Sequence, residues 1–142
     1  MYKVIIIEDD PMVASINKQY VELTSSFHVE ATFKNGILAL QYLQNCTVDL
    51  IILDYYTPQM NGDEFIDQLH AAGMTPAIIM VTSANDAETV RRLISRGVTD
   101  YLVKPFEYDR FKAALERFAK RQEELKTSTS ASDLGQAEID RL

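Results

Sequence analysis

The chain has 142 residues, of which 46% are hydrophobic, and this length and composition suit one globular domain with its own core. Fourteen basic against twenty-one acidic residues give a net charge of −7, which argues against direct binding of this segment to a nucleic acid backbone. No apolar run approaches the roughly 20 residues that span a bilayer, and the single cysteine has no disulfide partner. We therefore expect a cytoplasmic protein that does not enter a membrane.

The first third of the chain predicts two strands that flank a helix. Residues 3–7 form a short apolar run typical of a buried strand, and Asp10 followed by Pro11 predicts the first turn of a helix. The expected apolar stripe of this helix consists of Val13, Ile16, Tyr20 and Leu23. Residues 27–34 alternate in the manner of a strand near a sheet edge, and the expected inward face carries Val29, Ala31 and Phe33.

The central stretch contains the most informative strand. Asn35 and Gly36 predict the start of a second helix, which leads to the uniformly apolar residues 50–53. Such a run is typical of a central strand buried on both faces, and it ends abruptly at Asp54. The loop over 57–62 then contains Pro58 and ends at Gly62, where glycine would tolerate a positive φ. This loop would leave the Asp54 carboxylate open to a ligand.

The second half repeats the pattern twice. A further helix is expected over 62–72, and the apolar residues 77–81 predict a strand that ends at Thr82. The next helix is expected to end at Gly97, and residues 99–103 form a fifth strand that leads into Lys104 and Pro105. A last amphipathic helix is expected over 107–126, with its apolar face made by Phe111, Leu115 and Phe118.

Five strands alternating with five helices predict an α/β fold with a doubly wound parallel sheet covered by helices on both faces. The carboxyl ends of all the strands then share one edge, which is where ligands bind in open parallel sheets. The residues expected at this edge are Glu8, Asp9, Asp54, Thr82 and Lys104. Residues far apart in the sequence would thus form one pocket.

These side chains predict a phosphoryl-transfer site. Carboxylates brought close together repel one another, so they must share protons or hold a cation, and hard oxygen ligands favour Mg2+. With the metal neutralising charge, a phosphoryl group could approach Asp54, while Thr82 and Lys104 would supply donors to its oxygens. The expected product is an aspartyl phosphate.

The chain resembles the receiver domains of two-component response regulators over residues 2–118. The motifs that carry the resemblance are residues 4–11, Leu53-Asp54 with Pro58 and Asn61-Gly62, residues 81–84, and residues 101–106. The resemblance implies a flavodoxin-like sheet with strand order 2-1-3-4-5. It further implies a signalling switch rather than an enzyme, in which Asp54 accepts phosphoryl from a sensor histidine kinase.

The resemblance also implies roles for other residues. Asp9, Asp54 and the Tyr56 carbonyl would ligate Mg2+, while Glu8, where the family often has Asp, would assist through water. Thr82 and Lys104 would contact the phosphoryl group.

Two further features follow from the same resemblance. The peptide between Lys104 and Pro105 is expected to be cis. Tyr101 would be the switch aromatic, which moves inward as Thr82 is drawn to the phosphoryl group, so that phosphorylation remodels the last two strand-helix faces. A homodimer through these faces is a further expectation.

A finer resemblance points to the citrate and C4-dicarboxylate regulators of the CitB/DcuR type. It is carried by residues 100–106, Arg110-Phe111 and residues 136–142. Those proteins continue into a helix-turn-helix DNA-binding domain. We therefore expect a receiver domain over 1–124 and, over 125–142, a linker with the start of a further helix that leads to a DNA-binding output domain beyond Leu142.

Three alternative functions compete with this interpretation, and the sequence leaves the first of them open. A stand-alone receiver would act in a phosphorelay or on a protein target, and whether the gene continues past Leu142 would distinguish it. An aspartate-nucleophile phosphatase would need Asp-x-Asp, but Tyr56 stands where the second acid should be. A flavin-binding protein of this architecture would need a hydroxyl-rich phosphate loop after the first strand, where this chain has residues 8–10, Glu-Asp-Asp.

Overall fold

The computed structural model describes residues 1–83 and 87–141, with side chains described through residue 127. In this part of the chain, five strands alternate with five helices. They are β1 (Tyr2–Ile7), α1 (Pro11–Leu23), β2 (Phe27–Phe33), α2 (Gly36–Leu43), β3 (Leu50–Asp54), α3 (Gly62–Ala71), β4 (Ala77–Thr82), α4 (Ala87–Ser95), β5 (Asp100–Val103) and α5 (Tyr108–Arg141). No described helix combines the length and apolar character needed to cross a membrane.

The strands form one parallel sheet in the order β2-β1-β3-β4-β5, which confirms the predicted doubly wound fold. β3 lies at the centre, and all five of its residues are buried. The chain begins in β1 and winds outward in both directions, so the strand order changes direction between β1 and β3. Ligands of open parallel sheets bind beside such a switch point, at the carboxyl ends of the strands.

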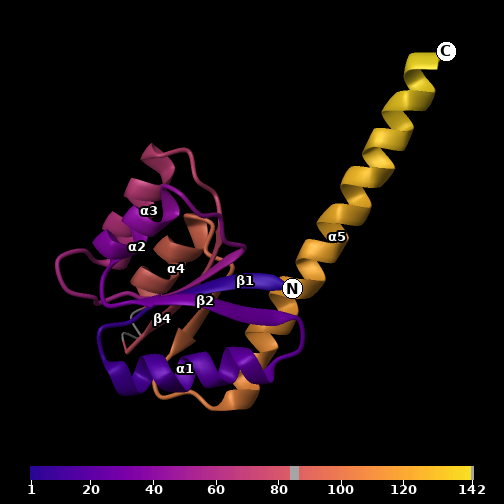
Figure 1. The fold of residues 1–142 in the computed structure, drawn as a ribbon. Helices are drawn as coiled ribbons and strands as arrows, with labels where there is room; N and C mark the ends of the chain where they lie inside the picture. The colour runs from indigo at the N-terminus through magenta and orange to yellow at the C-terminus, as the bar shows by residue number, and fades with distance from the viewer. Residues whose placement is uncertain (84–86, 142) are drawn as a thin grey trace.

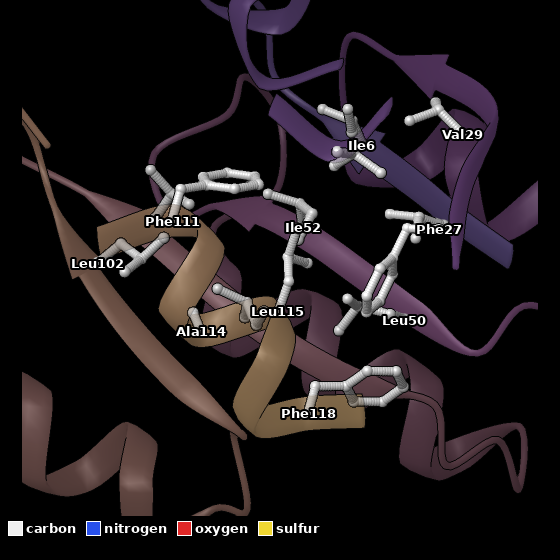
Figure 2. Packing of buried hydrophobic residues seen from close by; sticks show 14 residues of the cluster. Ile6, Phe27, Val29, Leu50, Ile52, Leu102, Phe111, Ala114, Leu115 and Phe118 are labelled. Carbon is white, nitrogen blue, oxygen red and sulfur yellow. The ribbon is translucent and has the colours of Figure 1, made fainter. Parts of the chain in front are cut away.

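Two hydrophobic clusters fill the space on the two faces of the sheet. The cluster on one side includes Val21 of α1 and Phe111 of α5, while the cluster on the other includes Ala39 of α2, Phe65 of α3 and Leu93 of α4. Figure 1 shows α1 across the sheet from α2 and α3. In Figure 2, Phe111, Ala114, Leu115 and Phe118 project from α5 toward the strands. The sheet is therefore covered on both faces, and its carboxyl edge is left for a site.

The buried face of α1 differs from the predicted stripe. Its buried residues are Ala14, Asn17 and Val21, whereas Ile16 and Leu23 are 40% and 68% exposed. The small side chain of Ala14 suits close packing of a helix on a sheet, and hydrophobic spacing alone cannot distinguish such a face from a neighbouring one. The predicted start of the helix is confirmed, because Asp10 is the N-cap and its carboxylate accepts from the Met12 amide at 2.9 Å.

The predicted inward face of β2 is wrong beyond Val29, because a β-bulge interrupts the pairing of β2 with β1. The register with β1 shifts between Val4 and Ile5, which pair with Val29 and Ala31 and leave the intervening residue of β2 without a partner in the register. An extra residue in one strand reverses the alternation beyond it. Val29 therefore packs in the cluster of α1 and α5, while Ala31 and Phe33 pack against the opposite cluster. The position of β2 at a sheet edge agrees with the prediction.

The last helix extends beyond its predicted end at residue 126. α5 continues for 34 residues to Arg141, and its far end projects well away from the sheet (Figure 1). The small polar residues 127–132 do not interrupt it. Serine and threonine each cost only a fraction of a kcal/mol relative to alanine inside a helix, and no proline occurs in this stretch. The division between a receiver over 1–124 and a linker over 125–142 stays a prediction.

Gly62 has a different role from the one expected, because positive φ in this loop occurs at Gln59 and not at Gly62. A Cβ atom at Gly62 would lie 2.7 Å from Cδ2 of Tyr55 and 2.9 Å from Cε of Met80. Both distances are shorter than real Cβ contacts, so glycine is needed here to let α3 approach β3 and β4 closely.

Replacing Gly62 with alanine should therefore destabilise the domain by about 1–3 kcal/mol, the usual cost of overpacking. Urea denaturation followed by far-ultraviolet circular dichroism measures the change in free energy of unfolding. An unchanged midpoint would show that Tyr55 and Met80 move aside without cost.

Candidate functional site

The carboxyl ends of β1, β3, β4 and β5 bring the predicted residues to one edge. Asp54 is the last residue of β3, and Thr82 is the last residue of β4, the strand that pairs with β3. Glu8 follows β1, and Lys104 follows β5. The parallel sheet thus brings residues as far apart in the sequence as Glu8 and Lys104 to a single acidic centre.

Three carboxylates converge at the switch between β1 and β3. Glu8, Asp9 and Asp54 each offer one oxygen, and these oxygens all lie within 4.8 Å of one another. Glu8 and Asp54 are 3% and 7% exposed, whereas Asp9 is exposed. An all-carboxylate donor set of hard oxygens open to solvent on one side fits a divalent cation such as Mg2+, which keeps several waters when bound.

Lys104 lies between two of these carboxylates. Its Nζ atom is 2.9 Å from Oε1 of Glu8 and 3.3 Å from Oδ2 of Asp54. Burial acts to lower the pKa of Lys104, but the hydrogen bond to Glu8 and the charge of Asp54 outweigh it and raise that pKa above its usual value. The ammonium therefore stays charged and offsets part of the repulsion between the two acids.

The pKa of Glu8 reflects both its burial and the negative charge of its neighbours. Burial raises the pKa of Glu8 to about 7, although hydrogen bonds from Lys104 and from the Asp10 amide act to lower it. The neighbouring charge of Asp54 raises it further. A carboxyl group in this position gains from a nearby cation, so the electrostatics agree with the donor set in favouring a bound metal.

The remaining predicted residues lie on or shortly after the strands that lead to this edge. Tyr56 lies two residues after Asp54 and is 56% exposed. Its backbone amide donates a hydrogen bond to Oδ1 of Asp54 at 3.3 Å. Thr82 is fully buried, and its carbonyl accepts from the Lys104 amide at 2.8 Å. Tyr101 is half-buried and packs against the cluster under α2, α3 and α4. The peptide between Lys104 and Pro105 is cis, as the resemblance implied.

A group of residues beside the site was missed by the sequence analysis. The Tyr55 hydroxyl donates to Oδ2 of Asp63 at 2.5 Å and accepts from Arg92 at 3.2 Å. Arg92 and Arg96 both form ion pairs with Asp63, and Arg96 also pairs with Asp67. The i,i+4 spacing of the two acids and of the two arginines is visible in the sequence, but it does not reveal that α3 and α4 lie side by side.

Comparison with known proteins agrees with this geometry. The family described as the response regulator receiver domain matches residues 4–116. This chain belongs to the response regulator receiver family. The match spans every residue of the acidic centre, together with Thr82 and Lys104. One motif residue named above, Ala84, lies outside the described residues.

Curated relatives of this receiver are similar over nearly its whole length. It is 36% identical over 141 residues to a probable C4-dicarboxylate response regulator DctR of Priestia megaterium, which covers 99% of this chain and 60% of the relative. It is 35% identical over 144 residues to the transcriptional regulatory protein DcuR of Escherichia coli K12, which covers all of this chain and 59% of the relative. The resemblance to the CitB/DcuR type is thus confirmed, and the receiver spans about three fifths of these relatives.

Solved receiver structures share the fold. The receiver domain of a putative LuxO repressor protein from Vibrio parahaemolyticus is 27% identical, with a TM-score of 0.81, and the match covers 89% of this chain and 96% of that one. The response regulatory domain of MrkE from Klebsiella pneumoniae is 24% identical, with a TM-score of 0.78 over 86% of this receiver and 98% of that chain. The second likeness shows the fold alone.

Proposed function

We propose that this receiver domain takes a phosphoryl group from a sensor histidine kinase onto Asp54 and switches a transcriptional output. The convergence of Glu8, Asp9 and Asp54, with Lys104 bound to two of them, is the observation that carries the proposal. A buried acid at the end of a central strand with a lysine partner suits a nucleophile that needs charge neutralisation around it. The family membership supports the same role.

The proposal includes a Mg2+ ion at the acidic centre. Asp9, Asp54 and the Tyr56 carbonyl would hold it, and Glu8 would assist through water. When bound, the ion would offset negative charge on the carboxylates and on the incoming phosphoryl oxygens. The exposure of Asp9 supports access for a hydrated ion from solvent.

Within this proposal the protein residues have distinct roles. An oxygen of Asp54 forms a bond to phosphorus as the bond between phosphorus and the kinase imidazole nitrogen breaks. Lys104, which already contacts Asp54, pairs with a phosphoryl oxygen, and the Thr82 hydroxyl donates to another. The Tyr56 amide, which donates to Asp54, holds the carboxylate in place during the reaction.

Incubation with acetyl phosphate and Mg2+ tests the proposal without a kinase. Intact-protein mass spectrometry should detect the addition of one phosphoryl group, which should be stable in acid and lost in base. No addition in the presence of Mg2+, with the domain folded, would contradict the proposed function.

The second part of the proposal concerns the switch. Thr82 is fully buried at the end of β4, so drawing its hydroxyl toward a phosphoryl group vacates space that half-buried Tyr101 of the neighbouring strand β5 can occupy. Thr82 would thereby couple Asp54 to the surface made by α4, β5 and α5. This coupling would operate after phosphorylation, not during it.

Replacing Thr82 with alanine should leave phosphoryl uptake in place but reduce the response of that surface, because the hydroxyl that follows the phosphoryl group is gone. Amide chemical shifts in α4, β5 and α5, recorded before and after phosphorylation, should change at least about twofold less than in the wild type. A response equal to that of the wild type would remove Thr82 from the switch.

We further propose that the output is a DNA-binding domain beyond Leu142 and that residues 125–142 connect to it. The names of the relatives DcuR and DctR, and the length of those proteins, support this reading. A homodimer through α4, β5 and α5 belongs to the same proposal, and the exposure of Ile94 and Val103 supports it. Reading the gene past codon 142 decides the first point, since a stop codon there would favour a stand-alone receiver.

A further inference from the structure

Helix α4 is held to the domain by very little apolar burial. Of its residues, Ala87 to Ser95, Leu93 is the only buried one, and Ile94 is 56% exposed. By comparison, α3 buries Phe65, Ile66 and Leu69 in addition to Gly62. An element with so few buried contacts lies at the low-stability end of a fold, so polar contacts decide how firmly it is held.

Arg92 of α4 and Arg96, which directly follows the helix, make polar contacts with α3. The Arg92 guanidinium binds Asp63 through two nitrogens, with Nη2 at 2.8 Å from Oδ2 and Nε at 3.4 Å from Oδ1. Arg96 approaches the same carboxylate at 3.0 Å and also pairs with Asp67. Two arginines thus face two aspartates across the helix interface, and the bidentate geometry fixes their orientation.

Tyr55, the residue that follows Asp54, connects this group to the carboxyl end of β3. Its hydroxyl contacts both Asp63 and Arg92, while its amide donates to the Val81 carbonyl at 3.0 Å and its carbonyl accepts from the Gly62 amide at 2.9 Å. The Tyr55 backbone is therefore fixed between β4 and α3. Its side chain extends from this fixed backbone to Arg92 of α4.

We propose that Tyr55, Asp63, Arg92 and Arg96 form a polar clamp that holds α4 against α3 in the unphosphorylated domain and must open when α4 moves. The clamp joins α4 to the backbone next to Asp54 by a route that does not pass through Thr82 or Tyr101. The inference rests on the proposed function only where it links the clamp to phosphorylation.

The ion pairs of the clamp are weak enough to break when α4 moves. The side chains of Arg92 and Asp63 are 45% and 19% exposed, so solvent screens their attraction. Partly exposed ion pairs restrain an element without locking it, which permits two arrangements of similar free energy.

Amide hydrogen exchange of the unphosphorylated chain tests the clamp directly. Arg92→Gln should accelerate the exchange of α4 amides by about fivefold, the effect of losing one partly exposed ion pair. Asp63→Asn, which weakens the contacts with both Arg92 and Arg96, should accelerate it at least as much. Tyr55→Phe, which keeps the ring and removes only the hydroxyl, should accelerate it by about twofold. Exchange in α1 and α2 should stay as in the wild type.

Arg91→Gln provides the matched control, because Arg91 is exposed on the same helix and forms no ion pair with any residue that the structure describes. Equal α4 exchange in the Asp63, Arg92 and Arg91 variants would overturn the clamp. If Tyr55→Phe alone behaved as wild type, the link to the residue after Asp54 would be wrong.

The link to phosphorylation is tested separately with acetyl phosphate and Mg2+. In the wild type, phosphorylation should accelerate α4 exchange, whereas in Asp63→Asn the additional acceleration should stay below about twofold, because the clamp is already open. The same acceleration in both proteins would contradict the link. A chain that took up no phosphoryl while its clamp variants still exchanged faster would refute the proposed function and leave the clamp standing.

Discussion

Replacing Asp54 with alanine should abolish the uptake of phosphoryl from acetyl phosphate. Asp54 is the acid that ends the central strand, and it contacts both Lys104 and the Tyr56 amide. Glu8 shares the burial, the contact with Lys104 and the acidic neighbours, but it follows β1, whereas Asp54 ends the fully buried central strand β3. Loss of the nucleophile removes the bond-forming atom itself, so we expect no residual labelling.

Intact-protein mass spectrometry after incubation with Mg2+ and acetyl phosphate measures this effect. Asp63→Asn serves as the control, because Asp63 is also partly buried and paired with a cation but lies on α3 outside the acidic centre. That variant should still be labelled. Persistent labelling of Asp54→Ala would show that another residue is the acceptor.

Replacing Asp9 with alanine should abolish Mg2+-dependent phosphorylation without unfolding the domain. Asp9 is exposed, so its removal vacates no core space, yet its oxygen lies within 4.8 Å of those of Glu8 and Asp54. Loss of a direct ligand should weaken Mg2+ binding by about 100-fold or more, since even outer-shell partners of metal ligands contribute 10–100-fold. Calorimetric titration with Mg2+ measures the affinity.

Asp10→Asn is the matched control for this experiment. Asp10 stands next to Asp9 but caps α1, where its Oδ1 accepts from the Met12 amide, and asparagine keeps that acceptor. This variant should bind Mg2+ and take up phosphoryl as the wild type does. Normal labelling of Asp9→Ala would exclude the proposed metal role, whereas loss of labelling in Asp10→Asn would show that the effect is not specific to Asp9.

The parallel sheet explains why so much of the site could be predicted. Short apolar runs that end in Glu8, Asp54, Thr82 and Lys104 mark strand ends, and a parallel sheet brings such ends to one edge whatever their separation in the chain. The contact of Lys104 with both Glu8 and Asp54 follows from this rule. Caps at Asp10 and Asn35 are local, so the sequence also predicts where α1 and α2 begin.

The features that could not be predicted depend on packing between elements. The bulge that separates Val29 from Ala31 comes from the register of β2 against β1, which apolar spacing does not specify. The buried face of α1 contains Asn17, whose Oδ1 atom has no hydrogen-bond partner among the residues that the structure describes and which no hydrophobic pattern would place inside. The contact of Tyr55 with Arg92 likewise requires the position of α4 relative to the end of β3.

The length of α5 has a mechanical consequence. The base of this helix packs against the sheet through Phe111, Ala114, Leu115 and Phe118. Beyond Phe118 the helix continues for another 23 residues to Arg141. At 1.5 Å per residue this arm reaches roughly 35 Å beyond its support, so a tilt of about 10° at the base would carry its tip about 6 Å. A small repacking of β5 against α5 would therefore be amplified along a lever before it reached anything attached to the far end.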